Sequence, residues 1–173
     1  MMEQWDVYDA AGKPTGRVKT RADEFAPGEY HLGASLWLVN SRGEVLIQKR
    51  AKTKFIGPGK WSITGGAVRA GETSRAGCVR EVAEEIGLEV DPEEIALLSR
   101  CFGKEIIFDD YILVLDVPLD GLTLQTEEVD EVRWVRIEEV FQLFEAGDFL
   151  MHSRADIEKA RAYIEAHAVC PLR

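Results

Sequence analysis

Residues 66–88 read GAVRAGETSRAGCVREVAEEIGL, and this stretch decides how the rest of the chain is interpreted. Apolar side chains recur over 73–86 at the three-to-four-residue spacing of a helix with one buried stripe. We expect Thr73 or Ser74 to cap the start of this helix and Gly87 to end it. The predicted stripe consists of Ala76, Val79, Val82, Ala83 and Ile86.

Three glutamates, Glu81, Glu84 and Glu85, stand at i, i+3 and i+4, so their carboxylates are predicted to share one helical face. Like charges at these spacings cost about 0.2–0.5 kcal/mol per pair. Glu84 and Glu85 also lie in the last turn, where the helix dipole disfavours anions. The simplest interpretation of these three glutamates is a solvated acidic face. A divalent cation bound between them would instead turn their mutual repulsion into attraction to the cation. Mg²⁺ prefers such oxygen ligands.

Neighbouring residues favour the cation site. Arg80 adjoins the carboxylates and is placed to orient them through bidentate hydrogen bonds, and Glu72 is placed to reach back to Arg80. Gly65 and Gly66 lie where a predicted strand enters the loop, and without side chains they allow the backbone to approach a ligand or a metal ion.

Residues 66–88 match the Nudix box, G-x5-E-x7-R-E-U-x-E-E-x-G-U with U aliphatic, at every specified position. The chain therefore resembles the Nudix hydrolases, and the stretches 57–61 and 128–135 are also similar to that family. The resemblance implies an α+β chain with the Nudix fold, an α/β/α sandwich around a mixed sheet, in which the box forms a loop–helix–loop.

The resemblance also implies site roles. Glu81, Glu84, Glu85 and the Gly65 carbonyl would bind Mg²⁺, with Mn²⁺ as an alternative, and Arg80, Glu72 and Gly66 would support them. The implied reaction is attack of water on phosphorus in a small-molecule diphosphate substrate. The general base stays open between Glu85, Glu128 and Glu131. For the acids of 127–131, a solvated turn is an equal alternative.

Basic and aromatic residues outside the box are substrate-binding candidates. The basic candidates for a phosphate contact are Lys49, Arg50, Lys52, Lys54 and Lys60, each of which is individually typical of a solvated surface charge. Phe55, Trp61 and Tyr111 are candidates for stacking on a base, with core packing favoured for Trp61. His31, His152 and His167 have no ligand-like spacing, so ordinary hydrogen bonds are expected of them.

The remaining pattern predicts strands around one central helix, with more helix at the end. Residues 1–30 are expected to form a hairpin extension, with strands at 5–8 and 15–20, and a second hairpin is expected to pair 34–39 with 44–50. Further strands are predicted at 61–63, 95–102, 105–117 and 131–136. Helices at 138–145 and 155–166, within a C-terminal part spanning 138–173, complete one expected domain over 1–173.

Composition limits the function. A net charge of −10 over 173 residues disfavours nucleic-acid binding. No apolar run approaches the roughly 20 residues that cross a membrane, and the start lacks a secretory signal. Three cysteines without metal-type spacing (Cys78, Cys101 and Cys170) predict reduced thiols in a cytoplasmic protein. The resemblance makes a homodimer an available assembly.

Two rival functions are weighed. Residues 6–9, 12–16, 30–31 and 46–50 resemble the isopentenyl-diphosphate isomerase-like branch of the superfamily, whose active-site strand carries a catalytic cysteine and whose metal ligands include histidines. The matching stretch here, 61–67, contains neither Cys nor His, which disfavours the isomerase. A non-catalytic Nudix binding module would be expected to lose box glutamates, and this chain retains them.

Overall fold

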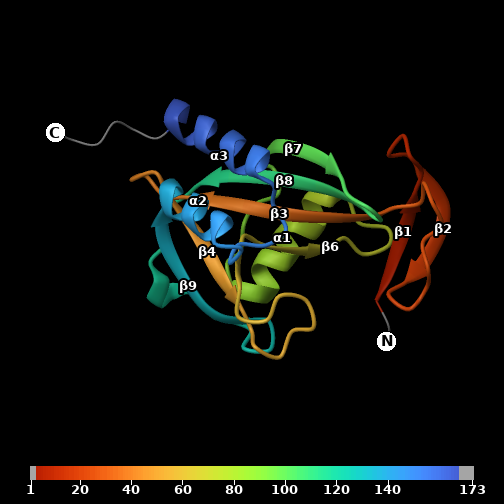
Figure 1. The fold of residues 1–173 in the computed structure, drawn as a ribbon, viewed down its shortest axis with the longest axis horizontal. Helices are drawn as coiled ribbons and strands as arrows, with labels where there is room; N and C mark the ends of the chain where they lie inside the picture. Colours follow the sequence, from red (N-terminus) through yellow and green to blue (C-terminus); the bar gives the residue numbers. More distant parts are fainter. Residues whose placement is uncertain (1–2, 168–173) are drawn as a thin grey trace.

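A mixed β-sheet with helices on both faces forms the body of the computed structural model, which describes residues 3–167 (Figure 1). This arrangement confirms the predicted α+β class and the α/β/α layering. Strand β3 (His31–Val39) runs parallel to β8 (Ile106–Val114) and antiparallel to β6 (Thr64–Ala67). Strand β7 (Ala96–Phe102) pairs with the other edge of β8.

A second group of strands is built around β4 (Glu44–Arg50), which pairs with β5 (Trp61–Ser62) and with β9 (Val129–Arg136). The turn between β3 and β4 forms as predicted, but the long hairpin ladder predicted there is wrong. Only Val39 and Val45 pair across it, because the other residues of the two strands pair with different neighbours. The two strands therefore diverge.

The helices separate the core into two parts. Helix α1 (Ser74–Ile86) covers one face of the sheet, and α2 (Ile137–Glu145) and α3 (Arg154–His167) cover the other (Figure 1). Under α1 the core contains Leu36, Leu46 and Val82, and under α2 and α3 it contains Trp37 and Ile157. The sheet is buried on both faces, which accounts for the nearly continuous apolar sequence of β3.

The N-terminal hairpin forms as predicted, from β1 (Gln4–Tyr8) and β2 (Pro14–Thr20). It is a separate two-stranded sheet at one end of the molecule (Figure 1). Reciprocal backbone hydrogen bonds between Tyr8 and Tyr30, of 2.7 and 2.9 Å, join it to the start of β3. This connection brings β1 toward the loop that precedes α1.

Most other predicted elements are present with shifted ends. The strand predicted over 105–117 ends at Val114, and a short 3-10 helix, Leu119–Gly121, follows. The strand predicted over 131–136 begins two residues earlier, at Val129. Cys78 and Cys101 are free thiols, as predicted, whereas Cys170 lies outside the described residues.

Candidate active site

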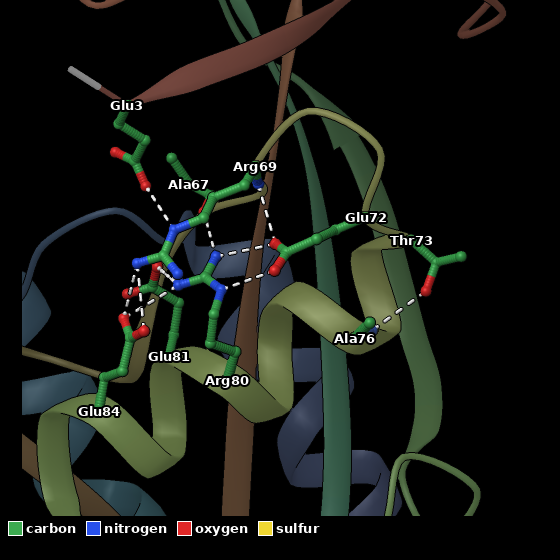
Figure 2. Close-up of polar contacts among 9 residues, drawn as sticks. All are labelled: Glu3, Ala67, Arg69, Glu72, Thr73, Ala76, Arg80, Glu81 and Glu84. Carbon is green, nitrogen blue, oxygen red and sulfur yellow. Dashed lines mark hydrogen bonds and ion pairs between the residues drawn. The ribbon is translucent and has the colours of Figure 1, made fainter. Parts of the chain in front are cut away.

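Both ends of α1 are fixed by local contacts. The hydroxyl of Thr73 accepts a hydrogen bond from the Ala76 amide at 3.1 Å, so Thr73 is the N-cap (Figure 2). Gly87 ends the helix in the left-handed region, with φ 69°. Beyond it, the backbone amides of Thr123 and Gln125 donate to the last carbonyls of the helix, at 3.0 and 2.9 Å. This capping draws the loop that leads to Glu128 against the box.

The buried stripe of α1 differs from the predicted one. Its fully buried members are Cys78, Val82 and Ile86, together with Gly77, whereas Ala76 is exposed. Val82 and Ile86 are therefore confirmed members of the stripe, whereas Val79 and Ala83 are only partly buried and the prediction omitted Gly77 and Cys78. Glu85 lies on this same buried face, which separates it from Glu81 and Glu84.

Arg80 is the centre of an ion-pair network (Figure 2). Its Nε and Nη2 donate to the two carboxylate oxygens of Glu72 at 2.8 and 3.0 Å, which is the predicted contact. Nη1 donates to Glu81 at 2.6 Å and to Glu84 at 3.1 Å, and Nη2 also donates to the Ala67 carbonyl at 3.0 Å. The guanidinium therefore fixes the box loop to the helix and orients two of the three carboxylates.

Gly66 leaves space for one of those carboxylates. A Cβ atom at position 66 would meet Oε2 of Glu81 at 2.5 Å, so any side chain there would displace the carboxylate. Burial raises the pKa of Glu81, against the opposing effect of Arg80. Hard oxygen donors beside side-chain-free backbone fit a divalent cation such as Mg²⁺ in donor chemistry.

Glu85 has different partners. Its Oε2 accepts a hydrogen bond of 2.7 Å from the Gln48 amide on β4 and one of 3.3 Å from the Gly65 backbone amide. The Thr64 hydroxyl in turn donates to Gln48 at 2.9 Å. Burial raises the pKa of Glu85 to about 7, and the charges of Glu81 and Glu128 add to the effect. This carboxyl can therefore both hold and release a proton near neutral pH.

The downstream acids contact basic residues. Glu128 forms an ion pair with Lys54, and Glu131 lies 4.0 Å from Lys49 in a half-exposed pair. Arg50 donates to the Ile56 carbonyl at 3.0 Å, and Lys60 donates to the Gly147 carbonyl at 2.5 Å. The described contacts of Arg50 and Lys60 thus hold the 51–60 loop, and Lys54 reaches an acid close enough to influence Glu85.

The aromatic candidates separate by burial. Trp61 is a core residue, as favoured, and Tyr111 is buried with its hydroxyl 2.7 Å from Ser74 Oγ. Phe55 is 99% exposed at the tip of the 51–60 loop and is the candidate left free to contact a ligand.

The histidines have structural partners. His152 Nε2 lies 2.8 Å from Asp110 Oδ1 in a buried network that includes Ser35. His31 stacks on Trp5 with ring centroids 4.4 Å apart, and His167 contacts the Tyr163 carbonyl within α3.

Among residues 3–167, no group of three or more His, Cys, Asp or Glu side chains is already arranged to hold a metal ion. Arginines contact Glu81 and Glu84, while Glu85 turns toward Gln48. Two surface clefts of about 370 and 480 Å³ are lined by segments near Trp134 and near Phe25, and no residue of the box lines either one. Within the described part of the chain, no helix is long and apolar enough to cross a membrane.

Four residues of the site were not predicted from the sequence: Gln48, Thr64, Arg69 and Glu3. Gln48 had a signal, because it is a polar side chain at the end of a strand segment that is otherwise apolar and buried. Arg69 occupies an unspecified position of the box, and Glu3 precedes the first strand. Their mutual contact depends on the tertiary placement of the N-terminal hairpin.

Comparison with known proteins adds independent evidence. Residues 29–154 match the family model described as the NUDIX domain. An uncharacterised Nudix hydrolase of Listeria innocua is 41% identical over 152 residues, which cover 86% of this chain and 89% of the relative. An isopentenyl-diphosphate Δ-isomerase of Escherichia coli is 34% identical over only 89 residues, covering 51% of this chain and 49% of the isomerase.

Solved structures show the same fold at low identity. A crystal structure of a Deinococcus radiodurans protein superposes with a TM-score of 0.73 at 20% identity, covering 93% of this chain and 99% of its own. The Nudix domain of Shewanella oneidensis NrtR, solved with ADP ribose, gives a TM-score of 0.59 at 17% identity and covers 84% of this chain and 93% of its own.

Proposed function

The chain belongs to the Nudix hydrolase family, whose members act on acid anhydrides in phosphorus-containing substrates, and we propose that it uses Mg²⁺ to hydrolyse a diphosphate linkage in a nucleoside diphosphate derivative or a similar small metabolite. The observation that carries this proposal is the arrangement of the intact box. Arg80 orients Glu81 and Glu84, and Glu85, on the same helix, accepts a hydrogen bond from the Gly65 amide of β6.

The proposed role of each residue follows from these contacts. Glu81, Glu84, Glu85 and the Gly65 carbonyl would hold Mg²⁺, or Mn²⁺ in its place. The bound cation would polarise the phosphoryl oxygens and lower the pKa of a bound water. Arg80, held by Glu72, keeps Glu81 and Glu84 in position and offsets the repulsion between their carboxylates.

Proton transfer is assigned to a carboxylate. As water attacks phosphorus, a new P–O bond forms, the anhydride P–O bond breaks, and the water proton passes to the base. Glu85, which lies beside the Gly65 amide, is one candidate, and Glu128 and Glu131 are the alternatives. Lys54, beside Glu128, is the first candidate for a phosphate contact among Lys49, Arg50, Lys54 and Lys60.

The proposed setting is the cytoplasm, supported by the free thiols of Cys78 and Cys101. The proposed partner is a small-molecule diphosphate substrate, and a homodimer remains a proposal to be tested by light scattering.

The test is product release with Mg²⁺ across a panel of diphosphates. The panel contains nucleoside di- and triphosphates, nucleotide sugars, dinucleoside polyphosphates, ADP ribose and isopentenyl diphosphate. Cleavage of one class that falls at least about 100-fold in Glu85→Gln supports the proposal. Isomerised isopentenyl diphosphate without hydrolysis would replace it with the isomerase alternative, and binding without turnover across the panel would favour a binding module.

A further inference from the structure

Glu84 is covered by a second arginine, which comes from the loop before α1. Nη2 of Arg69 lies 3.1 Å from each carboxylate oxygen of Glu84 (Figure 2). The Nε of Arg69 lies 3.4 Å from Oε1 of Glu3, just before β1. One guanidinium thus bridges a carboxylate of the box and a carboxylate of the N-terminal extension.

The two arginines of the cluster are held very differently. Arg80 donates to Glu72, Glu81, Glu84 and the Ala67 carbonyl, and its side chain is 15% exposed. Among the described residues, the guanidinium of Arg69 contacts Glu84 and Glu3, and its side chain is 45% exposed. Exposed ion pairs are weak, because water competes for both partners and salt screens them. Arg69 is therefore the arginine that an arriving cation can displace.

The N-terminal extension fixes the loop on which Arg69 stands. The amide of Ala70 donates to the Gln4 carbonyl, and the amide of Gly71 donates to Oδ2 of Asp6, both at 2.8 Å. These bonds lie immediately beyond Arg69 in the sequence, so its backbone has a fixed position relative to β1. Glu3 is thereby held within reach of the Arg69 guanidinium.

We propose that Arg69 competes with the divalent cation for Glu84, and that Glu3 is the anchor that keeps Arg69 beside the site when the cation displaces it. The proposal rests on the proposed role of Glu84 as a cation ligand. Arg69 is a positioning residue in this scheme, since it acts through Glu84.

The expected size of the effect follows from the competition. If Arg69 covers Glu84 for 70–90% of the time, the apparent dissociation constant of the cation rises by about 3–10-fold over that of the uncovered site. Arg69→Gln should therefore bind the cation about 3–10-fold more tightly. Glu3→Gln should bind it more weakly, by about 2–3-fold, because Glu3 contacts Arg69 only at 3.4 Å in the bridged state and can pair fully with it once Arg69 has left Glu84.

The experiment measures Mn²⁺ binding to the full chain by the electron paramagnetic resonance signal of free Mn²⁺, with no substrate present. Glu3→Gln is measured alone and combined with Arg69→Gln. The matched controls are Arg154→Gln and Glu145→Gln, which make the same charge changes in an exposed ion pair carried by α2 and α3 on the opposite face of the sheet. Melting in EDTA verifies that every variant is folded.

Tighter binding by Arg69→Gln than by Arg154→Gln supports the proposal, provided that Glu3→Gln has less than half its effect once Arg69 is replaced. Equal effects of Arg69→Gln and Arg154→Gln would overturn it, as would an undiminished effect of Glu3→Gln in the double variant. Glu84→Gln distinguishes a failure of the proposed cation site from a failure of the proposed competition by Arg69. If it binds Mn²⁺ as the wild type does, the proposed cation site fails, whereas a failure of Arg69→Gln alone removes only the competitor.

Discussion

Replacing Glu85 by Gln should stabilise the protein without cation at alkaline pH while removing its activity. Glu85 is 5% exposed, and its carboxylate lies in the core-facing stripe of α1, where ionisation is costly. Gln keeps the size of the side chain and can still accept the hydrogen bond from the Gln48 amide. The substitution therefore removes the charge and leaves the packing in place.

The magnitude follows from the pKa. A folded-state value of about 7, against the ordinary 4.5, corresponds to about 3 kcal/mol of unfolding free energy. Because the folded state holds the Glu85 proton more tightly than the unfolded state does, wild-type stability falls as pH rises from about 4.5 to about 7. Above pH 7 the loss is complete. In a chain of this length it corresponds to roughly 6–12 °C in melting temperature.

The assay is thermal melting in EDTA of the wild type and Glu85→Gln from pH 5 to pH 9. The melting temperature of the variant should exceed that of the wild type least at pH 5, and the difference should grow up to about pH 7 and then stay constant. Glu84→Gln is the matched control, because its carboxylate is 41% exposed and partners both Arg69 and Arg80, so its loss should not stabilise. A difference between the wild type and Glu85→Gln that is independent of pH would refute the assigned burial cost.

Gly66→Ala should weaken Mn²⁺ binding by about 10-fold, because the new Cβ displaces the Glu81 carboxylate, whereas Gly121→Ala, with nothing closer than 3.5 Å, should not. Equal Mn²⁺ affinity in the two variants would contradict this reasoning. His152→Gln should cost about 3 kcal/mol at pH 6, since it leaves the buried Asp110 without its charged partner and with the hydroxyls of Ser35 and Ser99 as its remaining donors. Burial alone would lower the pKa of His152, but the hydrogen bond and charge of Asp110 outweigh it and raise the pKa. The stabilisation is therefore complete below pH 6.5 and lost as pH rises through the raised value, so guanidinium unfolding should show a smaller cost at pH 9.

Features set by neighbours in the chain could be predicted from the sequence. Helix α1 was predicted within one residue, because its caps at Thr73 and Gly87 are local. The contact between Arg80 and Glu72 was predicted because the box places one just before the helix and the other within it. The layered fold followed from the order of strands and helices together with the resemblance.

Features set by tertiary contacts could not be predicted. The divergence of β3 and β4 depends on the other strands that pair with each of them. The different environments of Glu81 and Glu85 depend on which side of α1 meets β4, and helical spacing alone placed both on one face. Arg69 and Glu3 are 66 residues apart in sequence and meet only because β1 folds back onto the box loop.

The charge distribution of the cluster links its stability to its function. Without a cation, the box carboxylates would repel each other and the C-terminal end of α1, and Arg80 and Arg69 offset this repulsion. The same contacts reduce the affinity of the carboxylates for a cation, so stability of the empty site and cation affinity oppose one another. Two arginines meet these opposing requirements separately. Arg80, whose side chain is 15% exposed, donates to four acceptor groups and keeps the ligands in position, while the more exposed Arg69 supplies a neutralising charge that can leave.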